Sequence, residues 1–266
     1  MNMVLSGLIA IGLYITVAIR ASTSPGAAHD GYSLRSATGL LALLALLAHA
    51  ATLYPLTVTG HGVNLGIFAA ASLVAWLVAG VAVLATARRP RGSLSVVILP
   101  FAAIVVALSL VFSQPHLVVH ASPGIALHIA LSLIAYALFA IAALQALYYA
   151  FAEHRLKAHH PVMGFLPPLT VMERTMFQLT GIAFVLLSVG LAIGGLYIED
   201  IRGQHLAHKI VFSLLAWITF AVLLAGRYWR RWRGRQAVKY IIIGFVLLAL
   251  GFFGSKIALE LILQRA

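Results

Sequence analysis

Long apolar runs alternate with short polar stretches along the whole of this chain. Eight runs are each long enough to cross about 30 Å of hydrocarbon as a helix. They lie near residues 3–19, 37–54, 64–87, 94–112, 124–151, 176–197, 206–225 and 237–263. The pattern predicts an all-α fold, a polytopic membrane bundle of about eight helices that forms a single transmembrane domain over residues 1–266.

The composition agrees with a membrane location. Hydrophobic residues make up 62% of the 266 positions and charged residues 9%, and the mean hydropathy is +1.03, far from the balance of water-soluble domains. The first apolar run has no positive charge before it, and the first cation is Arg20 on its far side. A cleavable signal carries its positive charge ahead of the apolar segment, so we expect a first membrane helix.

The basic residues cluster in short segments between the apolar runs. The formal net charge is +12, but the cations do not line one continuous face as a nucleic-acid surface would, so anionic lipid of the bilayer is the expected partner. Fourteen of the 18 Lys and Arg residues fall on one side of the predicted bundle, and the positive-inside rule makes that side cytoplasmic. Both termini are then periplasmic, which places the chain in a bacterial inner membrane. The other four cations are Arg202, Lys209, Lys256 and Arg265.

Prolines and glycines punctuate the predicted spans. The longest loop is expected over residues 154–175. In the sixth span, Gly190 and Gly194 have the four-residue spacing of small residues that lets another backbone approach closely, and we expect ordinary bundle packing there. Four prolines are expected just outside a helix or in its first turn: Pro55, Pro90, Pro115 and Pro123.

Histidine is the residue type that carries the clearest chemical signal. The chain has 11 histidines, and the predicted topology distributes them unevenly. Four fall on the cytoplasmic side, where we expect solvated loop residues: His29, His154, His159 and His160. The other seven map to periplasmic loops or to the outer third of a helix: His49, His61, His116, His120, His128, His205 and His208.

Three of these histidines lie within predicted spans. His128 follows Pro123 by five residues and His49 precedes Pro55 by six, so at a rise of 1.5 Å per residue each is about 8–9 Å inside its helix end. His208 lies in the first turns of the seventh span. Because burying an ionisable side chain in a membrane without a partner is costly, such residues are functional candidates.

A b-type heme suits this set of residues. The chain has no cysteine, which excludes disulfides, thiolate metal sites and covalent c-type heme. Imidazoles can hold the iron, apolar side chains can solvate the porphyrin, and Lys209 and Arg202 can pair with the propionates. A closed zinc site is the alternative, from the pairs His116 and His120 or His205 and His208.

Three stretches of the second half point to a known family. Residues 127–136 read Leu-His-Ile-Ala-Leu-Ser-Leu-Ile-Ala-Tyr, and a glycine-bearing span runs over 180–195. A third stretch runs from His208 through the basic Trp-Arg-Gly-Arg turn at 232–235 to the Gly-rich segment ending at 254. Over residues 123–256 the chain resembles the heme-handling cytochrome c assembly superfamily, the CcsA and CcmC type, and most of all its shorter YpjD/HemX-like branch.

The resemblance implies a heme ligand at His128, because a histidine at the start of the matching helix is a proposed ligand in the family. Two family features are missing. Leu-Ala-His-Lys at 206–209 replaces the tryptophan-rich segment ending in Trp-Asp-Pro-Lys, and residues 255–266 contain no counterpart of the second periplasmic histidine. His208 falls where the lost loop ended and is our candidate for the ligand opposite His128.

The sequence therefore predicts a heme-binding inner-membrane protein that acts in heme trafficking or cytochrome c maturation. Heme b binds near the periplasmic face between His128 and His208, with His49 as an alternative or second-site ligand. We expect a binding and assembly factor rather than an enzyme, because no acid–base pair, nucleophile or nucleotide loop occurs. Cytochrome c maturation proteins or other membrane proteins are the expected partners. A transmembrane b-type electron carrier and a heme-free membrane scaffold or regulator stay open, and a transporter is a third, weaker alternative.

Overall fold

The computed structural model describes residues 2–23, 36–59, 62–88, 95–112, 117–118, 122–158, 168–197 and 207–254. Within these residues the chain forms eight helices that are long and apolar enough to cross a membrane, which confirms the all-α membrane bundle. The described helices group into two compact units. The helices before residue 121 form the first unit, and those after it form the second. The single transmembrane domain expected over residues 1–266 stays a prediction.

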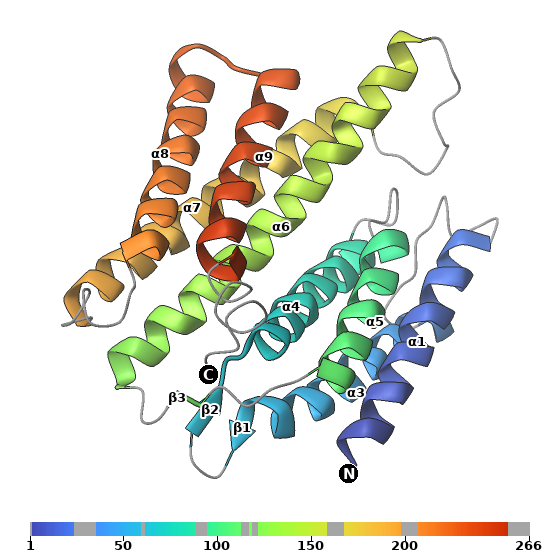
Figure 1. Cartoon of the computed structure of the whole chain (residues 1–266). Coiled ribbons are helices and arrows are strands. Elements are labelled where there is room, and N and C mark those ends of the chain that lie inside the picture. The colour runs from blue at the N-terminus through green and yellow to red at the C-terminus, as the bar shows by residue number, and fades with distance from the viewer. Residues whose placement is uncertain are drawn as a thin grey trace. The chain divides into compact units, whose positions relative to one another are not determined.

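The first unit contains four helices and a small sheet (Figure 1). Its elements are α1 (Met3–Thr23), α3 (Ala37–Thr57), β1 (Val58–Thr59), β2 (Gly62–Asn64), α4 (Ile67–Arg88), α5 (Ser95–Phe112) and β3 (Leu117–Val118). Helix α1 packs against α3 and α5, and α4 packs against α3 and α5. The three strands pair antiparallel in the order β1-β2-β3, with Val63 opposite both Val58 and Val118. Hydropathy did not predict this sheet because its strands are two or three residues long.

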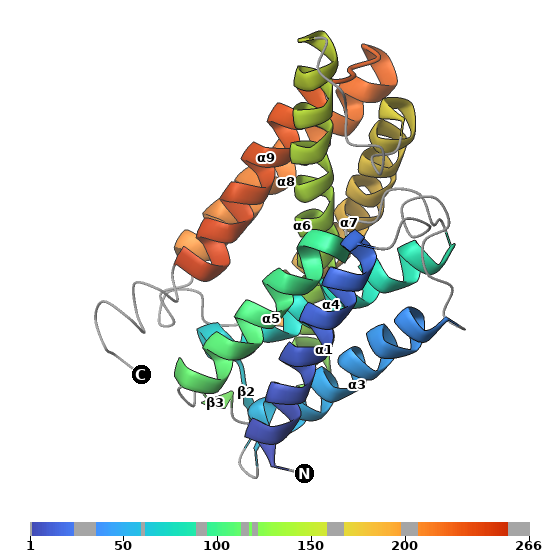
Figure 2. The same ribbon diagram turned by 90° about the vertical axis from the view of Figure 1, so that its right-hand side faces the viewer.

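The second unit contains the other four helices. Its elements are α6 (Pro123–Lys157), α7 (Leu169–Tyr197), α8 (Ala207–Trp229), α9 (Arg235–Ala249) and the π-helical turn η1 (Leu250–Gly254). Helices α6 and α7 pack along their lengths, and α9 packs on both α6 and α8. Figure 2 shows α8 and α9 side by side, as Figure 1 does.

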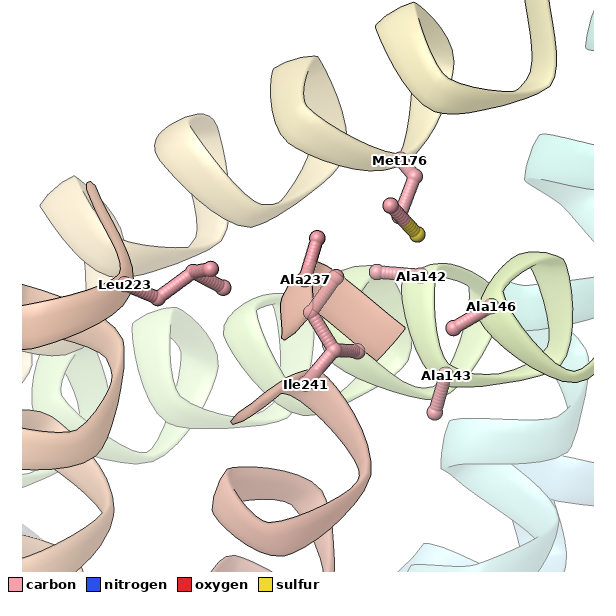
Figure 3. Close-up of a cluster of buried hydrophobic side chains, with 7 residues drawn as sticks. All are labelled: Ala142, Ala143, Ala146, Met176, Leu223, Ala237 and Ile241. Carbon is pink, nitrogen blue, oxygen red and sulfur yellow. The ribbon is translucent and has the colours of Figure 1, made fainter. Parts of the chain in front are cut away.

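Small side chains bring the helices of the second unit together. A buried cluster contains residues from all four helices. Its members are Ala142, Ala143 and Ala146 of α6, Met176 of α7, Leu223 of α8, and Ala237 and Ile241 of α9. Figure 3 shows Ala237 and Ile241 between the alanines of α6 and Leu223. Alanine lets helix backbones approach closely, which is how membrane helices gain dispersion contacts when lipid is as apolar as their side chains.

Helices α6 and α7 extend further than hydropathy predicted. The spans expected at 124–151 and 176–197 are Pro123–Lys157 and Leu169–Tyr197, so the loop expected over 154–175 is wrong at both ends. His154 is an exposed helical residue rather than a loop residue. A hydropathy pattern detects only the apolar part of a helix, whereas α6 continues into a polar last turn. There Lys157 pairs with Glu153 at 2.5 Å, and such an i,i+4 ion pair stabilises a helix end.

Two further boundaries differ from expectation. Pro55 lies inside the last turn of α3 rather than outside it, while Pro123 occupies the first helical position of α6 as predicted. The last span, expected over 237–263, begins at Arg235 and is α-helical to Ala249 and π-helical over Leu250–Gly254, while its expected end at 263 lies outside the described residues. The hydroxyl of Tyr136 on α6 donates to the Leu248 carbonyl and accepts the backbone N–H of Phe252. A side chain inserted between these two backbone groups explains the wider turn.

One buried carboxylate ties the start of α7 to the last turn of α8 and to the turn between α8 and α9. Glu173 accepts from Arg227 Nη1 at 2.7 Å and from Arg233 Nε at 3.2 Å. Arg227 also lies over the Phe177 ring, 4.5 Å from its centroid. We call this the Glu173 end of the second unit. At the opposite end, which we call the His128 end, α6 begins, α7 ends and α8 begins, and the Tyr197 ring lies against Gly124.

Candidate functional site

His128 lies in the second turn of α6, at the His128 end. Ser122 caps the helix by accepting the N–H of Ile125 at 3.4 Å, and Pro123 occupies its first position. The Nδ1 atom of His128 lies 2.6 Å from the carbonyl oxygen of Gly190 on α7. Since a carbonyl can only accept, Nδ1 carries the proton, and the lone pair of the neutral ring is on Nε2. Among the described residues, nothing hydrogen-bonds to Nε2.

The half-buried ring of His128 rests against the backbone of α7. A Cβ atom built on Gly194 would lie 2.8 Å from both Cε1 and Nδ1 of the ring, whereas one built on Gly190 would meet Ser132 Oγ at an ordinary 3.5 Å. The two glycines therefore do different things. Gly190 supplies the carbonyl, and Gly194 leaves space for the imidazole.

His49 lies in α3 of the first unit and is fully buried. Its Nδ1 lies 3.0 Å from the hydroxyl of Tyr14 on α1, and its Nε2 lies 3.0 Å from the hydroxyl of Ser72 on α4. Both ring nitrogens are thus satisfied by protein groups from two other helices. A metal needs one of those nitrogens, so ligation by His49 requires a break in this network.

His208 lies in the first turn of α8 and is exposed. No hydrogen bond or ring contact between His208 and His128 occurs within the described residues, so their predicted pairing stays a prediction. Lys209 follows on the same turn, and its carbonyl lies close to Gly251 of η1. Arg202 lies outside the described residues, as do His61, His116, His120 and His205.

The described part of the His128 end holds one oriented imidazole and apolar side chains, which are groups that a heme can use. The zinc alternative involves His116, His120 and His205, which lie outside the described residues and leave it untested. In the part of the chain that the structure describes, no three His, Cys, Asp or Glu residues gather closely enough to hold a metal ion, although a structural zinc site normally takes four ligands. Heme iron needs only one or two axial side chains, and apolar groups bind the macrocycle. Leu127 and Leu196 at this end expose 50% and 78% of their surface.

The partners of the two span histidines could not be predicted from the sequence. Tyr14, Ser72 and Gly190 lie 35, 23 and 62 residues away from the histidine that each contacts. The spacing of Gly190 and Gly194 was the one local signal, and it predicted packing without predicting which side chain would fill the space. The other two contacts, those of His49 with Tyr14 and Ser72, could have been found only from positions that co-vary among related sequences.

Comparison with known proteins agrees with this architecture. Residues 37–263 match the family model described as "Cytochrome C assembly protein". The chain is 34% identical to the "Inner membrane protein YpjD" of Escherichia coli K12 over 244 residues, which cover 90% of this chain and 92% of that protein. It is 27% identical to the "Cytochrome c biogenesis protein CcsA" of Nostoc punctiforme over 88 residues, or 32% of this chain and 25% of that protein. No solved structure matches the chain.

The eight apolar helices and the inner-membrane relative define a multi-pass protein of the bacterial inner membrane. The chain belongs to the cytochrome c assembly protein family, because the family model covers most of its length. The resemblance seen in the sequence covered only 123–256, whereas the family match begins at residue 37 and so includes α3, α4 and α5 of the first unit.

Proposed function

We propose that this chain binds heme b through Nε2 of His128 and acts in heme trafficking or cytochrome c maturation. The observation that carries the proposal is the hydrogen bond from Nδ1 of His128 to the Gly190 carbonyl. Metal-binding histidines commonly donate their second ring N–H to a backbone carbonyl, which fixes the tautomer and the ring orientation. Family membership supports the choice of heme as the ligand.

The remaining parts of the proposed site come from the same end of the second unit. His208 is the candidate second axial ligand, because α8 begins at the His128 end and the side chain is exposed. Lys209 and Arg202 are the candidate propionate partners. Heme would supply the porphyrin and its iron, while the chain binds the iron through an imidazole, surrounds the macrocycle with apolar groups and keeps the orientation of the ligand fixed.

The charge distribution supports a periplasmic position for this site. The Glu173 end and the helix ends near it carry nine described cations: Arg155, Lys157, Arg174, Arg227, Arg230, Arg231, Arg233, Arg235 and Lys239. By the positive-inside rule this end is cytoplasmic. The His128 end is then periplasmic in this proposal.

The test is a hemin titration of the detergent-purified protein, followed by visible spectra. Wild type should bind heme with low-spin b-type bands, since the proposed site has two axial ligands, His128 and His208. His128→Ala should bind at least about tenfold more weakly, and His208→Ala should leave a high-spin heme. His154→Ala is the matched control, because His154 lies on the same helix but is exposed at its other end, and it should bind as wild type.

Two results would overturn the proposal. Wild type that takes up no heme after expression with ample heme supply would favour the heme-free scaffold or regulator. Unchanged binding by His128→Ala would assign the heme to other ligands. A second heme with its own pair of histidines would instead favour the transmembrane electron carrier.

A further inference from the structure

We infer that Gly194, together with the Gly190 carbonyl, is a positioning element that sets the tautomer and the direction of His128. This inference rests on the proposed function, because it concerns how the heme ligand is held. It assigns a role to two glycines whose spacing alone indicates only helix packing. We call the two glycines and the α7 backbone between them the glycine seat.

The first step is the proton. A neutral imidazole has one N–H and one nitrogen lone pair, and without a fixed hydrogen-bond partner proton exchange lets either nitrogen carry the proton. The Gly190 carbonyl lies 2.6 Å from Nδ1 and accepts a hydrogen bond. The ring therefore keeps its proton on Nδ1, and Nε2 is ready to bind iron without a change of tautomer.

The second step is the space. Carbon atoms that are not bonded attract most strongly when about 3.5–4.0 Å apart, but a Cβ at position 194 would approach Cε1 and Nδ1 of His128 to 2.8 Å. The imidazole is the mobile end of a side chain, so we expect it to turn away from α7 and to lose the hydrogen bond to Gly190. Glycine at 194 thus leaves the room in which the ring forms that hydrogen bond.

The next residue provides a matched control. Gly195 lies one position along the same helix, and nothing lies within 4 Å of a Cβ built there. Both Gly194→Ala and Gly195→Ala raise the intrinsic helix propensity of α7 by the same amount. Any difference between the two variants therefore reports on the His128 ring and not on helix formation.

The third step is the consequence for the ligand. A ring that has left the seat samples both tautomers and several orientations, so only a fraction of the molecules present Nε2 to the iron. Loss of the groups that orient metal-binding histidines typically weakens metal affinity by about 10- to 100-fold. Gly194→Ala should therefore weaken heme binding by about tenfold or more, although the atoms of His128 are unchanged.

The experiment combines hemin titration with nitrogen NMR of histidine-labelled protein. The variants are Gly194→Ala, Gly195→Ala and His128→Ala, and the signal missing from His128→Ala identifies the His128 ring. We expect the Nδ1–H tautomer in wild type and in Gly195→Ala, with heme affinities within twofold of each other. Gly194→Ala should show mixed tautomers and the tenfold loss.

The outcomes separate the glycine seat from the proposed function. Wild type that binds no heme would refute the proposed function, and the tautomer of His128 would still decide the seat. Heme binding that is lost in His128→Ala but equal in the two glycine variants would keep the function and overturn the seat. If Gly194→Ala does not fold, the wild-type spectrum alone decides, since an Nε2–H tautomer of His128 contradicts the inference.

Discussion

His49 and His128 look equivalent in the sequence but differ in the structure. Each lies about 8–9 Å inside the expected end of an apolar helix. His49 is 0% exposed, and both of its ring nitrogens are hydrogen-bonded to side chains of the first unit. His128 is half-buried in the second unit and uses one nitrogen, on a backbone carbonyl.

The difference shows that depth in a membrane span is a weak criterion for a ligand. Burying a polar group is costly unless it is hydrogen-bonded, and a protein can meet that cost with its own side chains, as it does at His49. A ligand needs a nitrogen that is left free while the ring is held in place. His128 meets that condition among the described residues, so it is the first candidate.

Replacement of His49 should give the largest loss of stability. In His49→Ala, the hydroxyls of Tyr14 and Ser72 lose their partner and a cavity opens between α1, α3 and α4. We expect about 3 kcal/mol of lost unfolding free energy, from two hydrogen bonds between helices and a large-to-small change in a packed interior. Denaturation in mixed micelles measures this loss, and heme bound per folded molecule should not change. A His49→Ala variant that is as stable as wild type but binds no heme would make His49, and not His128, the leading candidate for the heme ligand.

Tyr136 tests, inside the second unit, whether a buried polar group that is hydrogen-bonded within the protein contributes to stability rather than to heme binding. Tyr136→Phe removes the hydroxyl that joins the Leu248 carbonyl and the Phe252 N–H, and it keeps the ring that packs on Phe252 and Phe253. We expect a loss of about 2 kcal/mol, because buried backbone groups left unsatisfied cost about 1–3 kcal/mol. Micelle denaturation should show it with heme affinity unchanged. A large loss of heme would mean that η1 takes part in the site.

A substitution at Ser72 tests whether a ring nitrogen without a hydrogen bond is enough for heme binding, or whether the nitrogen must also be accessible to heme. Ser72→Ala removes the partner of His49 Nε2, which leaves His49 with one bonded nitrogen, as His128 has. We expect a loss of about 1 kcal/mol and no additional heme, because the ring stays enclosed by three helices. Denaturation and a pyridine hemochrome count measure the two effects. A second equivalent of heme in this variant would show that His49 is a latent ligand.

The sequence predicts the lipid-embedded fold well and the polar contacts poorly. The fourth span was expected over 94–112 and is Ser95–Phe112, because a run of aliphatic residues leaves a helix as the only structure with its backbone satisfied in lipid. The last turn of α6 and the first turns of α7 were missed because their residues are polar and form ion pairs through Glu153 and Glu173, which a hydropathy pattern does not detect. His128 could be named in advance, but Gly190 and Tyr14 could not, since neither contact is local in the chain.

Replacement of His128 should have the smallest effect on stability. In His128→Ala, the Gly190 carbonyl stays within the hydrogen-bond ladder of α7, and the side chain that is lost was only half-buried. We expect a change below about 1 kcal/mol, similar to that of the exposed control His154→Ala, while heme affinity falls at least about tenfold. Denaturation and hemin titration of the same preparations measure both quantities. A loss as large as that of His49→Ala, with heme retained, would make His128 a packing residue, and the contrast between the two histidines would then vanish.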